Sequence, residues 1–439
     1  MGDDYGDSSV QTTNLAMAFV DQTTAECSVL VSTMKEINEK VRAETELRKT
    51  LIQKVPDPLR SIENGAEYFN PKIVAIGPYH RGDPQVQPME EIKKAAACDF
   101  CNSPSHSAEE FYTKVGEVAG EARSCYADRF EDMISEKEFT DMMFFDGCFL
   151  LEFISRDSRP SSFLKRWMTT RDYRYNLIFR DLMLLENQIP WVVLEALMSL
   201  RPVPINEFIQ LFPVTADVDF NGLLTKGEGS GHKPCHLLDL VHERYLGPKM
   251  EQKDKNVASG MSFFSSATDL AEVGVRIRAS KTFHFRDISF HRDLLFGRLS
   301  LPPIVIDDLT PVLIANMVAF EWCTVDESDY GVGSYLSLLA LLMSGEEDVK
   351  ELRSKMIMRS LLSDRRTLDF FESLSPHLLP GDSYTHVLVC LNDYYRKRRV
   401  RVLVHKFIYK NFKFILAATS AVIFFVTILQ TIFTVYPRK

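Results

Sequence analysis

Apolar residues recur along most of this chain at the three- and four-residue spacing that is typical of helices. Near the N terminus, this spacing predicts an amphipathic helix that packs on the folded body through Leu30, Met34, Ile37 and Val41. Longer helical patterns cover residues 109–155, 163–200, 311–325, 333–359 and 364–374. The runs FTDMMFFDGCFLLEFI and DLMLLENQIPWVVLEAL are too apolar for a protein surface, so we expect them to form the central core.

A smaller part of the chain has the pattern of strands. The run KIVAIGPY (72–79) is apolar and ends in a turn signal, Gly77 and Pro78, which indicates a strand or an extended segment. Between residues 281 and 308, the alternation in FHFRDISF and the run LSLPPIVIDD predict a few strands or a hairpin. Residues 213–234 and 246–262 have the Gly, Pro and charge content of loops. The expected fold class is therefore predominantly α, an α+β fold with a small β-hairpin element.

The longest uncharged run lies at the C terminus, from Phe414 to Val435. At about 1.5 Å per helical residue, its 22 residues would reach roughly 33 Å, enough to cross a hydrocarbon core of about 30 Å. We therefore expect a large helical body followed by one C-terminal transmembrane helix, with these two residues at the ends of the membrane anchor.

The charges divide unevenly between the body and the tail. Residues 396–439 carry ten Lys and Arg and no Asp or Glu, so the formal net charge of −9 combines a tail of +10 with a body of −19. Because a phosphate backbone is bound by clustered basic residues, this acidic body argues against a nucleic-acid partner. Most of the basic residues precede the apolar run, and the positive-inside bias then predicts a single-pass protein in the lipid bilayer whose body faces the cytosol. We expect a tail anchor in the plasma membrane rather than the endoplasmic reticulum.

These patterns divide the chain into five parts. They are a disordered N terminus (1–14), a mostly helical body (15–395), a basic juxtamembrane segment (396–413), the transmembrane helix (414–435) and a short tail (436–439). The N terminus lacks the basic start and the apolar run of a secretory signal. We therefore expect the eight cysteines to be reduced thiols rather than a disulfide framework.

Two groups of residues have the side chains that bind metals or transfer electrons. Cys98 and Cys101 have the spacing of a redox pair or of half a zinc site, to which His106 could add a ligand. The densest group of ligand-type residues contains His232, Cys235, His236 and His242. The run HLLDLVHERY reads equally well as a helix that packs Leu237, Leu238 and Val241. Since no second CxxC follows, we predict no metal site and no cofactor.

Carboxylates in the core helices offer a further possibility. Two sets could pair as general acid and base: Asp141, Asp146 and Glu152, or Asp181, Glu186 and Glu195. In helices this apolar, such groups more often cap neighbours or bond buried amides. The nearest approach to a hydrolase elbow, GEGSG (227–231), has its serine one place out of position, and the phosphate-loop and HExxH motifs are absent from the sequence. We therefore predict no catalytic residues.

The most informative polar residues are Glu186, Asn187 and Gln188, which lie between LMLL and an apolar run that starts at Ile189 and Pro190. We expect all three to be buried and hydrogen-bonded, because an unmade buried hydrogen bond costs about 1–3 kcal/mol. Such a network would fix a bend at Pro190 rather than perform chemistry.

The motifs resemble those of a plant family catalogued as domain of unknown function 247, also called UPF0481. The matching stretches begin with VPDPLRSIENGAEYFNPKIVAIGPYHRG (55–82), FFDGCFLLEFI (144–154), DLMLLENQIPWVVLEAL (181–197) and HLLDLVHERY (236–245). They continue with SATDLAEVGVRIR (266–278), FRDISF (285–290), LPPIVIDDLTPVLIANMVAFEWC (301–323) and GEEDVKELRSK (345–355), so the resemblance runs from about residue 50 to the end. The combination of IGPYH and LLENQIP is highly specific, and we expect a structural motif of Gly77, Pro78, Tyr79, His80, Glu186, Asn187, Gln188 and Pro190.

The resemblance implies a helical body with an anchor and offers no catalytic residues to carry over. In grasses, members of this family are implicated as determinants of pollen and stigma self-incompatibility. We therefore hypothesise a membrane-tethered plant protein that acts through recognition of an unknown protein partner or through signalling, in self-incompatibility or defence. The alternative is an enzyme with a cryptic acid/base or thiol site, for instance a pocket that gathers His80, Asp146 and Glu186.

Overall fold

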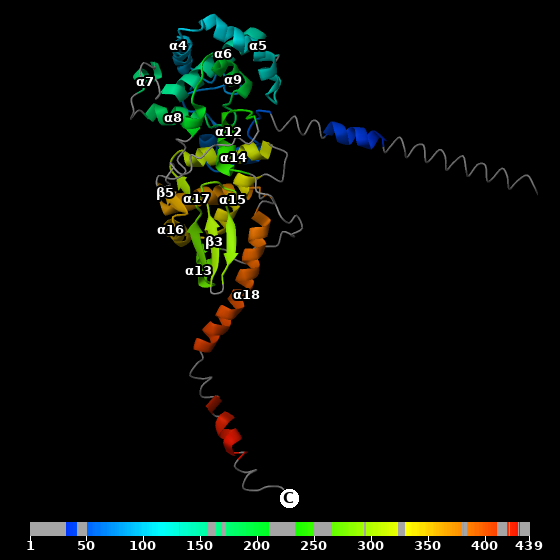
Figure 1. Ribbon diagram of the computed structural model, residues 1–439, viewed down its shortest axis with the longest axis vertical. Helices are drawn as coiled ribbons and strands as arrows, with labels where there is room; N and C mark the ends of the chain where they lie inside the picture. The colour runs from blue at the N-terminus through cyan, green and yellow to red at the C-terminus, as the bar shows by residue number, and fades with distance from the viewer. Residues whose placement is uncertain are drawn as a thin grey trace, which may run out of the picture.

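The computed structural model describes residues 32–41, 51–130, 132–156, 163–168, 173–209, 233–248, 266–293, 296–323, 330–379, 381, 384–410, 419–420, 422–428 and 430. Helices dominate these residues, and two small sheets lie toward one end of the body (Figure 1). The predicted predominance of helix with a small β element is confirmed.

The first half of the body is a helical layer. Its elements are α2 (Asp57–Arg60), α3 (Gly65–Phe69), α4 (Met89–Cys101), α5 (Ala108–Ser124), α6 (Glu136–Ser155), α7 (Phe163–Trp167), α8 (Tyr173–Asp181), α9 (Trp191–Leu200) and α10 (Ile205–Ile209). Helix α6 is buried along nearly its whole length, and α4, α5 and α9 pack against it. The helix predicted over 109–155 is interrupted because Ser135 and Glu138 form a capping box that starts α6 anew.

The second half contains both sheets. Its elements are α12 (Leu237–Leu246), α13 (Ala267–Glu272), β1 (Val275–Ala279), β2 (Ser289–Arg292), β3 (Gly297–Leu301), β4 (Ile304–Ile306), α14 (Thr310–Cys323), α15 (Gly331–Leu341), α16 (Glu346–Ser354), β5 (Met358–Ser360), α17 (Asp364–Leu374), the 3-10 helix η3 (Ser375–His377) and α18 (Thr385–Lys410). The three-stranded sheet has the order β1-β3-β2, in which β2 and β3 are antiparallel and β1 and β3 are parallel. Strand β4 pairs in parallel with β5, which overlaps the end of the helix predicted over 333–359.

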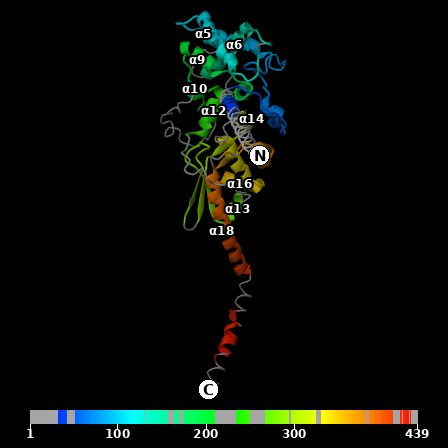
Figure 2. The ribbon, with the colours of Figure 1, turned by 90° about the vertical axis from the view of Figure 1, so that its right-hand side faces the viewer.

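Helix α14 lies between the helical layer and the sheets (Figure 2). It packs against α3, α12, α15 and β4, and nearly all of its residues are buried. Asn316 in this helix accepts a hydrogen bond from the backbone of Leu185 at 2.8 Å and donates one to the carbonyl of Tyr68 at 2.8 Å. The two halves therefore share one interior.

The C-terminal part of the structure corrects one prediction. Among the described residues, no helix is both long and apolar enough to cross a membrane. Helix α18 has 26 residues but carries many charged ones. The predicted transmembrane helix is therefore wrong for the described chain, and its predicted ends, Phe414 and Val435, lie outside the described residues.

Helix α18 also runs without a break through the predicted boundary between body and juxtamembrane segment at residue 395. It packs against β2 and then extends beyond the body (Figure 1). The predicted disordered N terminus (1–14) and most of the two predicted loops, 213–232 and 249–262, lie outside the described residues.

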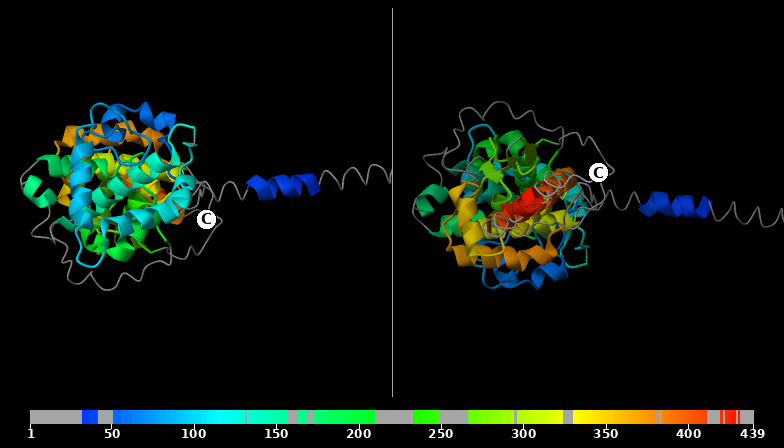
Figure 3. Two further views of the ribbon diagram at one scale, coloured as in Figure 1. Left: turned by 90° about the horizontal axis from the view of Figure 1, so that it is seen from above. Right: turned by 90° about the horizontal axis from the view of Figure 1, so that it is seen from below.

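Residues 32–41 form the helix that the N-terminal pattern predicts, but its apolar side is not covered. Met34, Ile37 and Val41 are 68%, 55% and 54% exposed, so the expected packing on the body is wrong. Figure 3 shows this helix apart from the body in both views along the long axis. Leu30, the first residue of the predicted stripe, lies outside the described residues.

Candidate functional site

The family-specific motifs meet at a buried extended stretch, residues 72–77, which pairs with no described strand. Val74 and Ile76 in this stretch are fully buried. A buried backbone N–H group without an acceptor is costly, so the donors of this stretch must be satisfied by other means. Side chains from α6, from the end of α8 and from the loop that follows α8 supply the acceptors.

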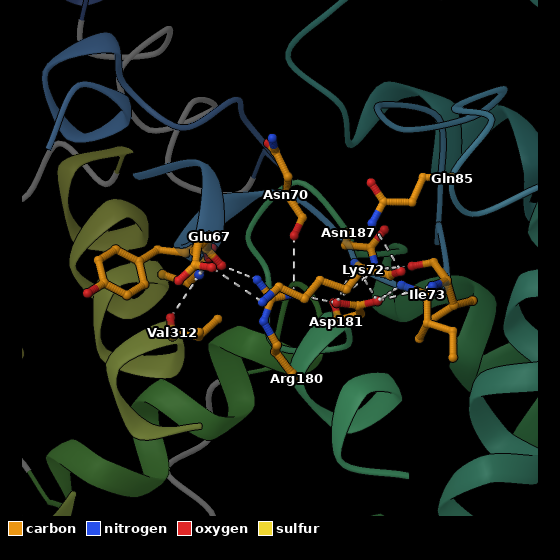
Figure 4. A network of polar contacts seen from close by, with 12 residues as sticks. Glu67, Asn70, Lys72, Ile73, Gln85, Arg180, Asp181, Asn187 and Val312 are labelled. Atoms are coloured by element: carbon orange, nitrogen blue, oxygen red, sulfur yellow. Dashed lines mark hydrogen bonds and ion pairs between the residues drawn. The ribbon is translucent and has the colours of Figure 1, made fainter. Parts of the chain in front are cut away.

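Asp181, the last residue of α8, accepts hydrogen bonds from three successive backbone N–H groups (Figure 4). Its carboxylate oxygens lie 3.0 Å from the nitrogen of Lys72, 2.7 Å from that of Ile73 and 3.0 Å from that of Val74. Arg180 donates to the same carboxylate at 2.6 Å. Burial raises the pKa of Asp181, although all four donors favour its charged form. The carboxylate thus takes the place of a neighbouring strand.

Asn187 also takes the place of a neighbouring strand. Its Oδ1 accepts from the N–H of Ile76 at 2.7 Å, and its Nδ2 donates to the carbonyls of Val74 at 3.0 Å and Asp181 at 2.9 Å. The side chain therefore bonds both a donor and an acceptor of the extended stretch, as a paired strand would do. Asn187 is 1% exposed.

Gln188 connects the same loop to α12. Its Nε2 donates to the carbonyls of Leu182 at 2.7 Å and Leu184 at 2.8 Å, and its Oε1 accepts from the N–H of Leu238 at 3.0 Å. The side-chain amide of Gln188 thus bonds two nearby carbonyls and one N–H group of α12, and it connects the loop after α8 to that helix.

Gly77 ends the extended stretch in a left-handed conformation. Its φ is +76°, and a Cβ there would lie 2.7 Å from the carbonyl oxygen of Gln188, so only glycine fits. Its N–H donates to Asp146 at 2.8 Å. Lys93 also donates to Asp146, at 2.5 Å, and to the carbonyl of Ala75 at 3.0 Å. Burial alone would lower the pKa of Lys93, but the carboxylates of Asp146 and Glu90 together outweigh it and raise that pKa.

Glu186 connects the loop after α8 to the N-terminal segment of the body. Its Oε1 accepts from the N–H of Val55 at 2.7 Å and from the guanidinium of Arg60. The Nε2 of His80 lies 3.3 Å from the other carboxylate oxygen. Burial would raise the pKa of Glu186, but the nearby His80 ring and the hydrogen bonds from Arg60 and Val55 lower it on balance. Glu186 is therefore an ionised structural link.

The remaining residues of the expected motif also make backbone contacts. Tyr79 donates its hydroxyl proton to the carbonyl of Ile52 at 2.9 Å, and burial raises its pKa. The carbonyl of Pro78 accepts from the N–H of Arg81 at 3.4 Å. Pro190 is buried and occupies the N-cap position of α9, where its fixed φ of −60° starts the helix.

The acid and base candidates are mostly used for structure. His80 and Glu186 do lie together, but Asp146 is bound by Lys93 and Gly77, as described above. Elsewhere, Asp141 accepts from the hydroxyl of Tyr112 at 2.7 Å, and Glu195 pairs with Lys233 at 2.6 Å. Asp141 and Glu195 therefore contact a tyrosine and a lysine rather than a second carboxylate that could act with them as acid and base.

The histidine and cysteine group around α12 follows the helix interpretation. His236 caps α12 by accepting from the N–H of Asp239 at 3.1 Å, and burial lowers its pKa to about 4. His242 lies 3.0 Å from Glu321, and Leu237, Leu238 and Val241 are buried. Within the described ranges, no group of three His, Cys, Asp or Glu residues could hold a metal ion, and His232 lies outside them.

Cys98 and Cys101, which have the spacing of a redox pair, lie beside a hollow of about 590 Å³ at the end of α4. The proposed third ligand, His106, pairs instead with Glu110 at 2.7 Å. The sulfur of Cys101 lies 3.9 Å from that of Cys148 on α6, a neighbour that the sequence spacing could not reveal. Two other hollows, of about 10 and 20 Å³, have room for little more than a water molecule.

Comparison with known proteins places the chain in one family. A family described as "Plant protein of unknown function" (DUF247) matches residues 52–426. The UPF0481 protein At3g47200 of Arabidopsis thaliana is 26% identical over 382 residues, which cover 79% of this chain and 77% of the relative. The putative UPF0481 protein At3g02645 of the same plant is 22% identical over 473 residues, which cover 83% of this chain and 87% of the relative.

No solved structure matches the chain. The family match spans most of the residues and includes both the segment around Gly77 and the loop around Asn187. The resemblance inferred from these motifs is confirmed, and the chain belongs to the plant family DUF247, also named UPF0481.

Proposed function

We propose that this chain acts by binding a protein partner rather than by catalysing a reaction. The observation that carries the proposal is the use of the motif side chains inside the body. Asp146, Asp181 and Asn187 are at most 1% exposed, and their oxygens are occupied by backbone N–H groups and by buried cations. A catalytic group needs contact with a substrate, whereas these groups make the interior rigid.

Helix 32–41, which lies apart from the body, is the surface that we expect to bind a partner. Its exposed apolar residues Met34, Ile37 and Val41 follow one helical face, while Lys35 and Lys40 lie among them in sequence. Amphipathic helices of this kind bind by inserting such a face into an apolar groove of a folded protein. The partner that fits is therefore a folded protein with an apolar groove.

The test is proximity labelling by the full chain in plant cells, with two matched variants. One carries Met34→Ser and Ile37→Ser on the apolar face, and the control carries Lys35→Ser and Lys40→Ser. Burial of an apolar side chain contributes about 1.5–3 kcal/mol, so we expect the first variant to lose partner affinity by more than about tenfold. A partner identified by labelling is then purified and its affinity for all three chains is measured.

Equal affinity of the partner for both variants would overturn the proposed surface. Failure of every labelled protein to bind the purified chain would overturn the recognition function itself. The role in self-incompatibility or defence, the plasma-membrane location and the lipid bilayer as a partner stay predictions from the sequence.

A further inference from the structure

Three of the cysteines gather where the end of α4 meets the middle of α6. Cys98 and Cys101 lie on the last turn of α4, and Cys148 lies on α6, which packs against α4. Cys98 is exposed, Cys101 is 6% exposed and Cys148 is completely buried. The sulfurs of Cys101 and Cys148 are 3.9 Å apart, which is direct van der Waals contact.

The hollow of about 590 Å³ gives small molecules access to this group. Cys98 and Cys101 both line it, together with Phe144 and Phe145 of α6 and Phe163 of α7. Its volume lies within the range of small-molecule pockets in proteins. Cys101 therefore has the hollow on one side and Cys148 on the other.

The surroundings distinguish the two buried sulfurs. A hydrogen bond from Cys148 and the nearby positive charge of Arg201 lower the pKa of Cys101, while burial raises that of Cys148 well above its usual value. Arg201 is fixed by the carbonyl of Phe100, to which it donates a hydrogen bond, and its guanidinium lies 5.0 Å from the ring centroid of the same residue. Cys101 is therefore the more acidic of the two thiols, and its sulfur is the one that reacts first.

We propose that Cys101 and Cys148 form a dithiol pair that a hydroperoxide oxidises to a disulfide. The thiolate of Cys101 attacks one peroxide oxygen, the O–O bond breaks, and an alcohol or water leaves after taking a proton from the solvent. Cys101 is then a sulfenic acid. The sulfur of Cys148 attacks the sulfenic sulfur, and its proton leaves with the hydroxide as water. In total, two thiols and one hydroperoxide give one disulfide, one alcohol or water, and one water.

The geometry requires only a local adjustment. A disulfide needs a sulfur separation of about 2.05 Å, so the two sulfurs, now 3.9 Å apart, must approach by about 1.9 Å. The product would link α4 to α6, the central helix of the helical layer. This pair lies away from helix 32–41 in the sequence, and the inference does not depend on the proposed binding function.

The test oxidises the reduced full-length chain with hydrogen peroxide and, separately, with cumene hydroperoxide. Remaining thiols are blocked with N-ethylmaleimide, and peptides are mapped by mass spectrometry with and without dithiothreitol. We expect a reducible cross-link between the Cys101 and Cys148 peptides with at least one oxidant, in the native chain and in Cys98→Ser. A cross-link with cumene hydroperoxide would identify an organic hydroperoxide as a substrate, and one with hydrogen peroxide alone would identify the smaller oxidant.

Cys148→Ala should lose the cross-link and leave a sulfenic acid at Cys101 that dimedone traps. The matched control is Cys323→Ala, which removes another buried thiol away from the hollow and should retain the cross-link. The proposal is overturned if Cys101 stays reduced with both oxidants, or if it pairs with Cys98 instead. It is also overturned if the cross-link forms equally well in concentrated urea, because contact in the fold would then not be its cause. The mapping of the native chain decides these outcomes even if Cys148→Ala fails to fold.

Discussion

The substitution Asn187→Leu tests the view that side chains replace a strand at residues 72–77. Leucine has the same branched skeleton of four heavy atoms but cannot bond the N–H of Ile76 or the carbonyls of Val74 and Asp181. Each buried group that loses its partner costs about 1–3 kcal/mol, so the three together should lower the free energy of unfolding by at least about 3 kcal/mol. That is a large fraction of the roughly 5–15 kcal/mol that stabilises a typical protein.

The matched control is Gln85→Leu, the same change of amide to leucine at the exposed edge of this network (Figure 4). Gln85 donates one long hydrogen bond, 3.4 Å, to the carbonyl of Lys72, so we expect a change within about 0.5 kcal/mol. Urea-induced unfolding followed by circular dichroism measures both variants. Amide hydrogen exchange at Ile76 adds a local measurement that should accelerate only in Asn187→Leu. A loss below about 1 kcal/mol in that variant would refute the account.

Three further predictions concern glycine, lysine and histidine positions. Gly77→Ala and Gly82→Ala both place a side chain at positive φ, but only the new Cβ at residue 77 meets a carbonyl oxygen, 2.7 Å away. Gly77→Ala should therefore lower the free energy of unfolding in urea by about 1–3 kcal/mol more than Gly82→Ala does. Lys93→Met leaves a buried carboxylate unpaired and should cost about 3–5 kcal/mol in the same assay, whereas Lys94→Met removes an exposed ion pair and should have no measurable effect. Burial lowers the pKa of His236 from 6.5 to about 4, so the unfolded chain binds the proton more tightly; this contribution to stability is complete above pH 6.5 and is lost as the pH falls toward 4. The loss should reach about 3 kcal/mol in unfolding titrations, and His236→Asn, which keeps a capping acceptor, should not show it.

Each of these comparisons has an outcome that contradicts it. Equal losses in the two glycine variants would mean that the close carbonyl can move aside. Equal effects of the two lysine variants would mean that the buried carboxylate finds another donor or becomes protonated. An unchanged pH dependence in the histidine variant would assign the acid sensitivity to other groups.

The sequence predicted the burial of Glu186, Asn187 and Gln188 because three polar residues lie between apolar runs, and burial then requires partners. It could not identify those partners, since the N–H groups that Asp181 and Asn187 accept from lie more than 100 residues earlier. Distance along the chain also explains the missed strands. Residues 358–360 become β5 only because β4 lies alongside, and a three-residue strand has no periodicity to detect.

Three other features were missed or misjudged because the local pattern was ambiguous or did not specify the tertiary packing. The break before α6 is marked by Ser135 and Glu138, a capping-box signal that the apolar pattern on both sides obscures. The contact of Cys101 with Cys148 depends on how α4 packs on α6, which local spacing does not specify. The exposed stripe on helix 32–41 shows that an apolar face alone does not determine what covers it.

The replacement of a strand by side chains also sets an order of events during protein synthesis. The N–H groups of residues 72–74 and 76 have no acceptor until Asp181 and Asn187 have been synthesised. The loop that contains Asn187 is itself bonded by Asn316 through the N–H of Leu185. At about 5–20 residues per second, a ribosome needs about 12–50 s to proceed from residue 72 to residue 316. Water is the partner of these N–H groups until Asp181 and Asn187 have left the ribosome, and the N–H of Leu185 gains its acceptor only when α14 follows.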